Sequence, residues 1–271
     1  MTTVQISLSP KRKRVTPGQI LLQIFLLIIL AVWVAPLTIM VRRSFIGQGF
    51  DNYIKVVTDA DFFMFLKNSV MVAALDIFLM VVCVSLAAFA FSKMEFRGRG
   101  LLYILTLLGM MMPAAGFIVP YFITLKSLGL MNQFGLVGPH VAASIPMSMM
   151  IIRNSFMDIE DEMIEASVID GCSRIGVFTQ MILPLGRNAI ATAVIFAFLG
   201  SWNDYLMPLV LLQKPEYMTL TLLPDRYKGF GGGDNVGVIF AALVLISVPI
   251  FIVYLTCQKF LQRGISAGTI K

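Results

Sequence analysis

The stretch Glu165–Pro184, EASVIDGCSRIGVFTQMILP, decides how the chain is interpreted. Acidic residues cluster just before it and at its start, which favours a helix start because carboxylates stabilise the positive end of the helix dipole. Gly171 is expected to end this helix in the left-handed conformation, and Ser173 is expected to cap a second helix. Pro184 is expected to close that second helix. The sequence therefore predicts a helix, a glycine turn and another helix.

Each predicted helix carries a narrow apolar stripe at helical spacing. The stripes hold Ile159, Met163, Ala166 and Ile169 in the first helix, and Ile175, Phe178, Met181 and Ile182 in the second. On physical grounds two interpretations are open. The element either packs on its own protein as an amphipathic loop or docks a soluble partner.

The rest of the chain is strongly apolar. Of its 271 residues, 58% are hydrophobic and only 13% are charged, and the mean hydropathy is +0.86. A soluble protein of this size would be left with too little polar surface, so the composition predicts a membrane protein. The spacing of Cys83, Cys172 and Cys257 is typical of neither a disulfide framework nor a metal site.

Six stretches are long and apolar enough to cross the hydrocarbon core as α-helices, which takes about 20 residues each. They are Ile20–Met40, Ser69–Phe91, Leu101–Leu125, Val137–Ile152, Ala189–Leu212 and Val236–Phe260. The first is interpreted as a span and not as a cleaved signal peptide, because its apolar run is too long. The expected fold is an all-α membrane bundle.

Positive charge sets the expected orientation, since cytoplasmic segments are enriched in Lys and Arg. With both termini inside, the internal segments hold the larger share of the 21 Lys and Arg residues. The basic run Lys11–Arg14 is interpreted as a topology anchor, not as a nucleic-acid patch. The stretch quoted above then lies in the longest internal loop, residues 153–187, on the cytoplasmic side.

Nucleotide binding is not expected of this chain. Its glycine run, GFGGGDN at Gly229–Asn235, lacks the Gly-Lys-Ser/Thr that completes a phosphate-binding loop. If nucleotide energy drives the protein, another polypeptide must bind the nucleotide. His140, the sole histidine, has no second ligand nearby in the sequence, so it is interpreted as a polar residue at a helix end and not as a metal ligand.

Polar residues within the predicted spans are candidates for a transport pathway. Asp76 is either a pathway or gating residue, because acids at membrane depth usually face the bundle interior, or a paired group near the outer interface. Trp202, Asn203, Asp204 and Tyr205 combine amide, acid and aromatic groups, which suits the recognition of sugars. The alternative is that they are hydrogen-bonding contacts between helices.

Helix-breaking residues interrupt the third predicted span at Gly109, Pro113, Gly116 and Pro120. Breaks at membrane depth are tolerated where protein or a cavity satisfies the freed backbone groups. We therefore expect a bend in this span, with Pro113 and Gly116 facing a pathway.

The quoted stretch resembles the signature of permease subunits of ABC importers, which is Glu-Ala-Ala, three residues, Gly, nine residues and Ile-x-Leu-Pro. Here the pattern is Glu165-Ala166-Ser167, Gly171 and Met181-Ile182-Leu183-Pro184, with Glu160 where a proline often precedes the helix. From about Lys67 to the end, the chain is similar to the maltose-type second permease of the sugar-importer branch. The stretches that carry this likeness are Met110–Pro139, Ser201–Leu212 and Arg263–Lys271.

The resemblance implies a type I importer permease fold with six transmembrane helices and a coupling helix between spans 4 and 5. It implies a first segment at 1–66, a permease domain at 67–260 and a tail at 261–271. The residues implied to couple to the ATPase are Glu165, Ala166, Ser167, Asp170, Gly171, Leu183 and Pro184.

The same resemblance implies a non-catalytic transport subunit of the bacterial inner membrane, with a sugar or polyol as substrate. Its partners would be a second permease, two subunits that bind ATP and Mg²⁺, and an extracytoplasmic solute-binding protein. Two other functions are a proton-coupled secondary transporter that uses Asp76 and Asp204, and a membrane scaffold that recruits an enzyme. The signature favours the importer, and no internal repeat typical of secondary transporters is evident.

Overall fold

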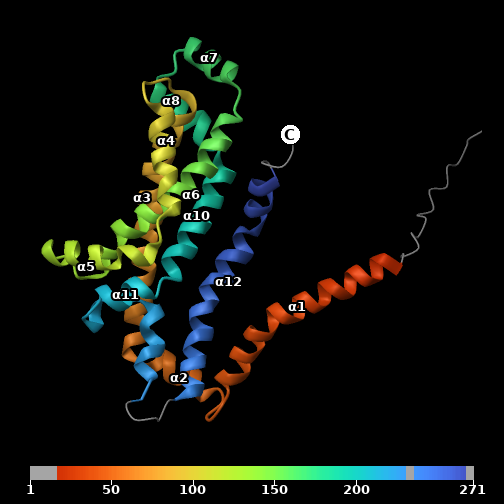
Figure 1. The fold of residues 1–271 in the computed structure, drawn as a ribbon, viewed down its shortest axis with the longest axis vertical. Helices are drawn as coiled ribbons and strands as arrows, with labels where there is room; N and C mark the ends of the chain where they lie inside the picture. The colour runs from red at the N-terminus through yellow and green to blue at the C-terminus, as the bar shows by residue number, and fades with distance from the viewer. Residues whose placement is uncertain (1–16, 230–234, 267–271) are drawn as a thin grey trace, which may run out of the picture.

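The computed structural model describes residues 17–229 and 235–266. The basic run at 11–14, most of the glycine run and the end of the tail lie outside these ranges. Within them the chain is helical and contains no strand. The elements are α1 (Pro17–Ser44), α2 (Asp51–Thr58), α3 (Ala60–Lys93), α4 (Arg99–Leu108), η1 (Gly109–Met111), η2 (Ala114–Phe117), α5 (Ile118–Ser127), η3 (Gln133–Leu136), α6 (Val137–Met157), α7 (Asp161–Ile169), α8 (Arg174–Val177), η4 (Phe178–Ile182), α9 (Leu183–Leu185), α10 (Arg187–Trp202), α11 (Leu206–Leu211), η5 (Pro215–Tyr217), η6 (Leu220–Tyr227) and α12 (Val236–Ser266) (Figure 1).

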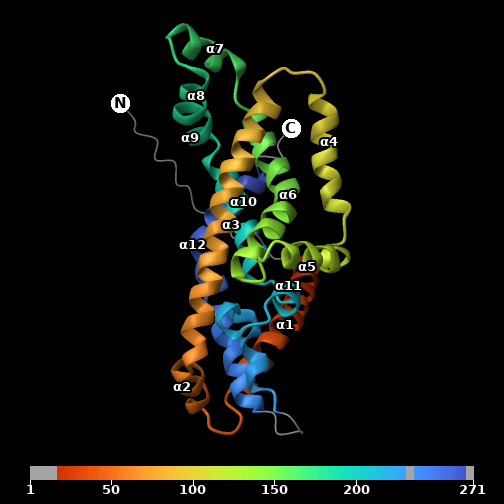
Figure 2. The same cartoon turned by 90° about the vertical axis from the view of Figure 1, so that its left-hand side faces the viewer.

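Four long helices, α3, α6, α10 and α12, form a bundle (Figure 1, Figure 2). Helix α10 contacts the other three, and α3 also contacts α6. Buried side chains such as Met80, Ile152 and Ala193 fill the space between α3, α6 and α10. Apolar side chains such as Phe78 are exposed on the outside of the same bundle. This surface suits contact with lipid, because water-soluble proteins rarely expose so much continuous apolar area.

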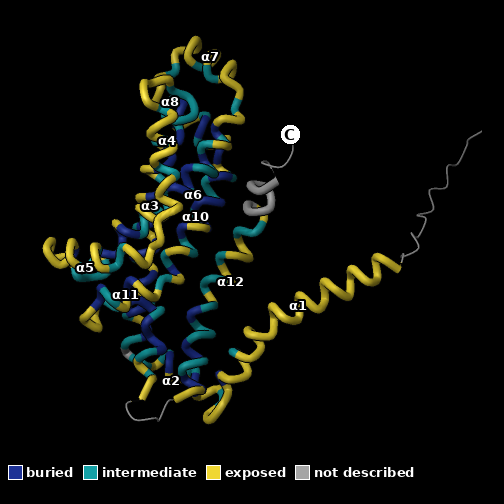
Figure 3. Tube along the Cα trace, viewed as in Figure 1, coloured by how far each residue is buried: buried dark blue, intermediate teal, exposed yellow. Residues whose placement is uncertain are grey.

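Helix α1 extends away from the bundle and contacts α12 (Figure 1). Its most apolar window has a hydropathy of 2.8, and none of that window is buried in this chain. Figure 3 shows it as exposed along nearly its whole length, and Trp33 is 77% exposed. Lipid or another membrane helix must therefore cover α1.

In the part of the chain that the structure describes, four helices are long and apolar enough to cross a membrane, and two further pairs pass the same test as bent helices, which gives up to six spans. The second pair, Arg174–Leu185 with Arg187–Trp202, begins before the predicted fifth span Ala189–Leu212 and includes part of the quoted stretch. The unbroken spans are Pro17–Ser44, Asp61–Lys93, Gln133–Met157 and Val236–Lys259. The all-α membrane fold predicted from the sequence is therefore confirmed.

The third predicted span is interrupted where the sequence places its helix breakers. The segments Arg99–Met111 and Ala114–Ser127 meet at an angle of 93° on either side of Pro113. Gly109 permits the approach of α6 at this point, because a Cβ there would lie 2.9 Å from Cγ of Pro146. The predicted interruption is confirmed, and the helical segments before and after it are nearly perpendicular to each other.

The fifth predicted span, Ala189–Leu212, is not one helix. Helix α10 ends at Trp202, and α11 begins at Leu206 after a three-residue turn. The carboxylate of Asp204 supports the start of α11 from one residue before its N-cap, because its Oδ1 accepts from the backbone N–H of Leu206 at 3.1 Å. Such a break is difficult to predict from the sequence, because a single acidic residue marks it within an apolar run.

The prediction that Pro184 closes the second helix of the quoted stretch is wrong. The chain stays helical from Arg174 to Leu185, and the π-helix Phe178–Ile182 precedes the proline. Pro184 has no backbone N–H, and its ring would crowd the preceding turn of an α-helix. The wider turn of a π-helix gives that ring room. The direction changes instead at Gly186, where a Cβ would lie 2.3 Å from the Phe156 ring. The following helix is bent by 75° relative to this one.

Candidate functional site

The quoted stretch forms a tip that projects from one end of the bundle (Figure 1, Figure 2). Helix α7 ends in a Schellman turn, in which Cys172 N–H donates to Ser167 O and Gly171 N–H donates to Val168 O, both at 3.0 Å. Gly171 has φ +87°, so the predicted left-handed glycine is confirmed. A side chain there would be strained although nothing lies within 4 Å of its Cβ.

The second helix of the tip begins at its predicted cap. The backbone N–H of Gly176 donates to Oγ of Ser173 at 3.1 Å. Phe178 and Ile182 are buried as expected, and the Phe178 ring lies 5.2 Å from that of Phe89 on α3. Ile175, predicted to share this face, is instead 75% exposed. The helix turns the neighbouring Val177 inward in its place.

Of the apolar stripe predicted for the first helix, only Ile159 packs on the bundle, while Met163, Ala166 and Ile169 are exposed. Ile169 is 85% exposed, and Met163 and Val168 are also exposed. Only Ile164 and the preceding Ile159 pack against the core near α3. With Ile175, the exposed residues form an apolar surface at the tip, which we call the tip surface (Met163, Val168, Ile169 and Ile175).

Two basic residues stabilise the end of the bundle that carries the tip: Lys93 contacts the segment just before the tip, and Arg153 joins α6 to α3 and α4. Lys93, at the end of α3, pairs with Asp161 at 2.6 Å and donates to Ile159 O at 2.5 Å. Arg153 donates from Nε to Phe91 O at 3.2 Å, and its guanidinium lies 4.1 Å from the centre of the Tyr103 ring. These contacts fix the end of the bundle from which the tip projects, while the outer surface of the tip stays exposed.

A second site lies within the bundle, where Asp76, His140 and Asp204 form a chain of hydrogen bonds. Nδ1 of His140 lies 2.8 Å from Oδ2 of Asp76, and Nε2 lies 2.9 Å from Oδ2 of Asp204. Their side chains are 3% (Asp76), 8% (His140) and 18% (Asp204) exposed. We call this arrangement the carboxylate–histidine bridge. It places Asp76 in a buried pair. His140 lies in the first turn of α6, at the helix end expected from the sequence, and has two acidic partners there.

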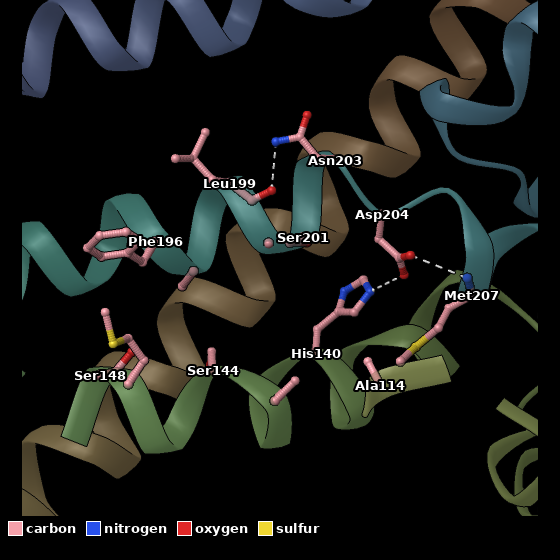
Figure 4. Close-up of a pocket in the computed structure, with 14 residues that line it drawn as sticks. Ala114, His140, Ser144, Ser148, Phe196, Leu199, Ser201, Asn203, Asp204 and Met207 are labelled. Atoms are coloured by element: carbon pink, nitrogen blue, oxygen red, sulfur yellow. Dashed lines mark hydrogen bonds and ion pairs between the residues drawn. The ribbon is translucent and has the colours of Figure 1, made fainter. Parts of the chain in front are cut away.

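Next to the bridge is a pocket of about 470 Å³ between α6 and α10 (Figure 4). Its lining residues are Ala114, His140, Ala143, Ser144, Met147, Ser148, Phe196, Ala197, Leu199, Gly200, Ser201, Asn203, Asp204 and Met207. Asn203 donates to Leu199 O at 2.9 Å, and its Oδ1 has no hydrogen-bond partner among the described residues. The pocket combines apolar walls with a few polar groups, as small-molecule sites do.

The other predicted pathway residues lie outside this pocket lining. Trp202 is buried in another part of the core, and its indole N–H donates to Ile246 O at 3.1 Å. The hydroxyl of Tyr205 donates to Asp225 at 2.8 Å. Pro113 and Gly116 lie at the bend between η1 and η2 and are exposed. Of the predicted residues, Asn203 and Asp204 line the pocket, and Asp76 is joined to it through His140.

The segment that contains η5 and η6 contacts the turn between α10 and α11. Oγ1 of Thr221 donates to Asp204 O at 2.8 Å, and Asn68 on α3 donates to Glu216 O at 2.9 Å. The hydroxyl of Tyr227 donates to Asp59 at 2.9 Å. Burial and this carboxylate raise the pKa of Tyr227 above its usual value, so the phenol stays protonated. The break in the fifth span is therefore braced by fixed neighbours.

An apolar helical bundle that holds a pocket with a few polar groups, and that carries an exposed tip at one end, is typical of a membrane transport subunit. Residues 80–267 match the family described as binding-protein-dependent transport system inner membrane component, and the chain belongs to this family. It is a permease subunit of an ABC importer, a transport component. The secondary-transporter hypothesis built on Asp76 and Asp204 finds no support among these relatives.

Several curated proteins share much of the sequence. The diacetylchitobiose uptake system permease of Streptomyces coelicolor is 33% identical over 82% of this chain and 74% of its own length. The trehalose/maltose transport system permease of Thermococcus litoralis is 32% identical over 82% of this chain and 81% of its own length. A chain of a bacterial ABC transporter that imports the acidic polysaccharide alginate has the same fold, with a TM-score of 0.78, 22% identity, and coverage of 89% of this chain and 95% of that one.

Proposed function

We propose that this chain forms half of the translocation pathway of an ATP-driven importer of a sugar or related polyol, and that residues 165–184 couple it to a separate ATPase. The observation that carries the coupling is the tip surface. Ile169 and Ile175 are 85% and 75% exposed at the end of the bundle, on a turn fixed by a left-handed glycine. An exposed apolar surface on a rigid element outside the membrane favours a protein partner.

The residues proposed to meet that partner are distributed along the tip. Glu165, Ala166 and Asp170 are exposed on α7 and its turn. Ser167 donates its hydroxyl to Ile164 O and supplies the carbonyl that closes the Schellman turn. Leu183 and Pro184 belong to the last helical turn before the bend at Gly186, which links the tip directly to α10. A movement of the docked tip would thus tilt α10.

The pocket supports an uncharged, hydroxyl-rich substrate. Ser144, Ser148, Ser201 and Asn203 contribute hydroxyl and amide groups, while Phe196 contributes an apolar aromatic surface. No Lys or Arg is among the described residues that line it. Relatives named for diacetylchitobiose and for trehalose or maltose transport support the same substrate class.

The complete importer would contain a second permease, two subunits that bind ATP and Mg²⁺, and an extracytoplasmic solute-binding protein. A solved relative of the same fold was obtained with a periplasmic protein that carries an alginate pentasaccharide. We place the chain in a bacterial inner membrane with both termini in the cytoplasm. Lys93 and Arg99 lie at the tip end of the bundle, which supports a cytoplasmic tip. The proposed segments remain 1–66, 67–260 for the permease domain, and 261–271.

A substitution at Gly171 tests the coupling. Gly171→Val places a β-branched side chain at φ +87° and costs roughly 1–2 kcal/mol in the turn geometry. If the ATPase needs that turn, co-purification with the variant should fall about tenfold, since 1.4 kcal/mol corresponds to that factor. Uptake of sugar by reconstituted complexes should fall with it.

Gly98→Val is the matched control, because Gly98 has φ +83° and also has open space around its Cβ. It precedes α4 at the same end of the bundle but lies outside the tip. It should suffer the same local strain and retain the ATPase. Full ATPase binding and normal uptake with Gly171→Val would show that the tip is only a packed loop.

A further inference from the structure

The carboxylate–histidine bridge joins three segments that are far apart in the sequence. Asp76 comes from the middle of α3, His140 from the first turn of α6, and Asp204 from the turn between α10 and α11. Ser201, at the end of α10, also donates to Oδ2 of Asp76. The bridge thus ties the broken fifth span to two unbroken helices at the depth of the pocket.

Each of the two N···O contacts of the bridge needs one proton between its two heavy atoms. The imidazole and the two carboxyl groups therefore form a cluster of three ionisable side chains, each largely buried, at the depth of the pocket. Oδ1 of Asp76 is buried and has no hydrogen-bond partner among the described residues. Such a cluster is costly within a membrane and would persist only if it holds something in place.

Asp204 is the member through which the bridge shapes the pocket. Its Oδ1 accepts from the backbone N–H groups of Leu206 and Met207 at 3.1 and 3.3 Å, so it starts α11. Its Oδ2 shares a hydrogen bond with Nε2 of His140, and both oxygens are therefore occupied by the protein. Asn203 and Ser201, one and three residues before Asp204, are both among the residues that line the pocket (Figure 4).

We propose that His140 is a positioning residue that acts through Asp204. Supported by its contact with Asp76, His140 holds the α10–α11 turn in place, so that Asn203 and Ser201 form the wall of the pocket that faces the substrate. The proposal rests on the proposed function, because it assigns the wall of that pathway. Without the bridge, the turn is free to shift away from the pocket while the tip and its ATPase contact stay intact. The expected defect is wasted hydrolysis, in which the ATPase cycles without moving substrate.

The test compares substrate moved per ATP hydrolysed in reconstituted complexes. His140→Leu removes both contacts and should lower this ratio about tenfold or more, the size expected when a buried charge pair loses a partner. His140→Gln can still donate to one carboxylate and should restore part of the ratio. In the double variant His140→Leu with Asp76→Asn, the loss should be no greater than with His140→Leu alone, because the two residues act through one bridge.

Ser247→Ala serves as the matched control, because Ser247 on α12 bonds only to Leu243 O of its own helix at 2.9 Å. It should leave the ratio unchanged. If His140→Leu fails to assemble, the isosteric Asp76→Asn takes its place and should lower the ratio about threefold. A ratio within twofold of wild type in these variants, or losses that add in the double variant, would overturn the proposal.

This outcome is distinct from failure of the proposed function. If the complex did not bind an ATPase, the wild type itself would show no ATP-dependent uptake. A merely structural role for His140 would lower uptake and hydrolysis together and would leave their ratio unchanged, which also contradicts a positioning role.

Discussion

The tip and the carboxylate–histidine bridge are built in opposite ways. The tip is a short continuous segment with apolar side chains turned outward, such as Ile169. The bridge gathers ionisable side chains from positions 76, 140 and 204 and turns them inward. The tip exposes apolar side chains, which suits a surface that a partner protein covers. The bridge buries ionisable side chains, which is tolerated because they pair with one another inside the protein.

This difference predicts different responses to mutation. Substitutions in the tip surface should leave folding unchanged and should weaken binding of the ATPase. Substitutions in the bridge should lower transport and leave ATPase binding unchanged. Comparing the two regions in one assay therefore separates docking from pathway geometry.

The largest effect is expected from charging the tip surface. Ile169→Glu combined with Ile175→Glu would force two unpaired carboxylates into a docked interface, at a cost of about 3 kcal/mol or more. ATPase binding should weaken more than a hundredfold, since each 1.4 kcal/mol is a factor of ten. Insertion should be normal, because both side chains are exposed in the free chain. The measurement is ATPase co-purification from membranes.

Ile54→Glu is the control for added charge, because Ile54 is exposed on α2 at the opposite end of the bundle. It should leave ATPase binding unchanged. If the doubly charged variant still bound the ATPase strongly, the tip surface would not be the docking site, and the contrast drawn between the tip and the bridge would be wrong.

An intermediate effect is expected from two isoleucines of the same tip segment. Ile182 is fully buried against the core, whereas Ile175 is mostly exposed. Ile182→Ala should lower the free energy difference between folded and unfolded protein by about 2–5 kcal/mol, because it leaves a cavity. Ile175→Ala should change it by about 0.5 kcal/mol or less. Thermal unfolding of the purified permease measures both, and equal shifts would show that the tip has no distinct outer surface.

Much of the tip was predictable because its determinants are local. Gly171 ends a helix and Ser173 begins one through contacts within three to five residues, and both predictions are confirmed. The apolar stripe of the second helix is confirmed at Phe178, Met181 and Ile182 but wrong at Ile175, and most of the stripe of the first helix is exposed, since helical spacing alone does not say which side meets the bundle. Pro184 was misplaced because a π turn, which has no clear sequence signal, lets the helix continue through it.

The bridge was not predictable in the same way. Asp76 and Asp204 were each identified as acids at membrane depth, but their common partner was taken for an isolated histidine. Only packing brings His140 within 2.8 and 2.9 Å of them. One signal was present, because two buried acids need a donor and the chain has a single histidine within a span. The break at Asp204 was missed for a related reason: the contact that supports the start of α11 is made by a residue inside an apolar run.

The smallest effect is expected at Asn203, which faces the pocket but does not belong to the bridge. Its amide donates only to Leu199 O within α10, so Asn203→Ala should leave the turn in place. If Oδ1 contacts the substrate, the loss of one hydrogen bond, about 0.5–1.5 kcal/mol, should lower uptake roughly two- to tenfold. Hydrolysis should fall in proportion, so that substrate moved per ATP stays at the wild-type value, unlike the result expected for His140→Leu. Asn154→Ala, at an exposed amide near the other end of α6, is the control and should leave uptake unchanged. If Asn203→Ala instead prevents assembly with the second permease, the polar residues of this turn serve as contacts between helices, and the wall of the pathway must be sought elsewhere in the pocket.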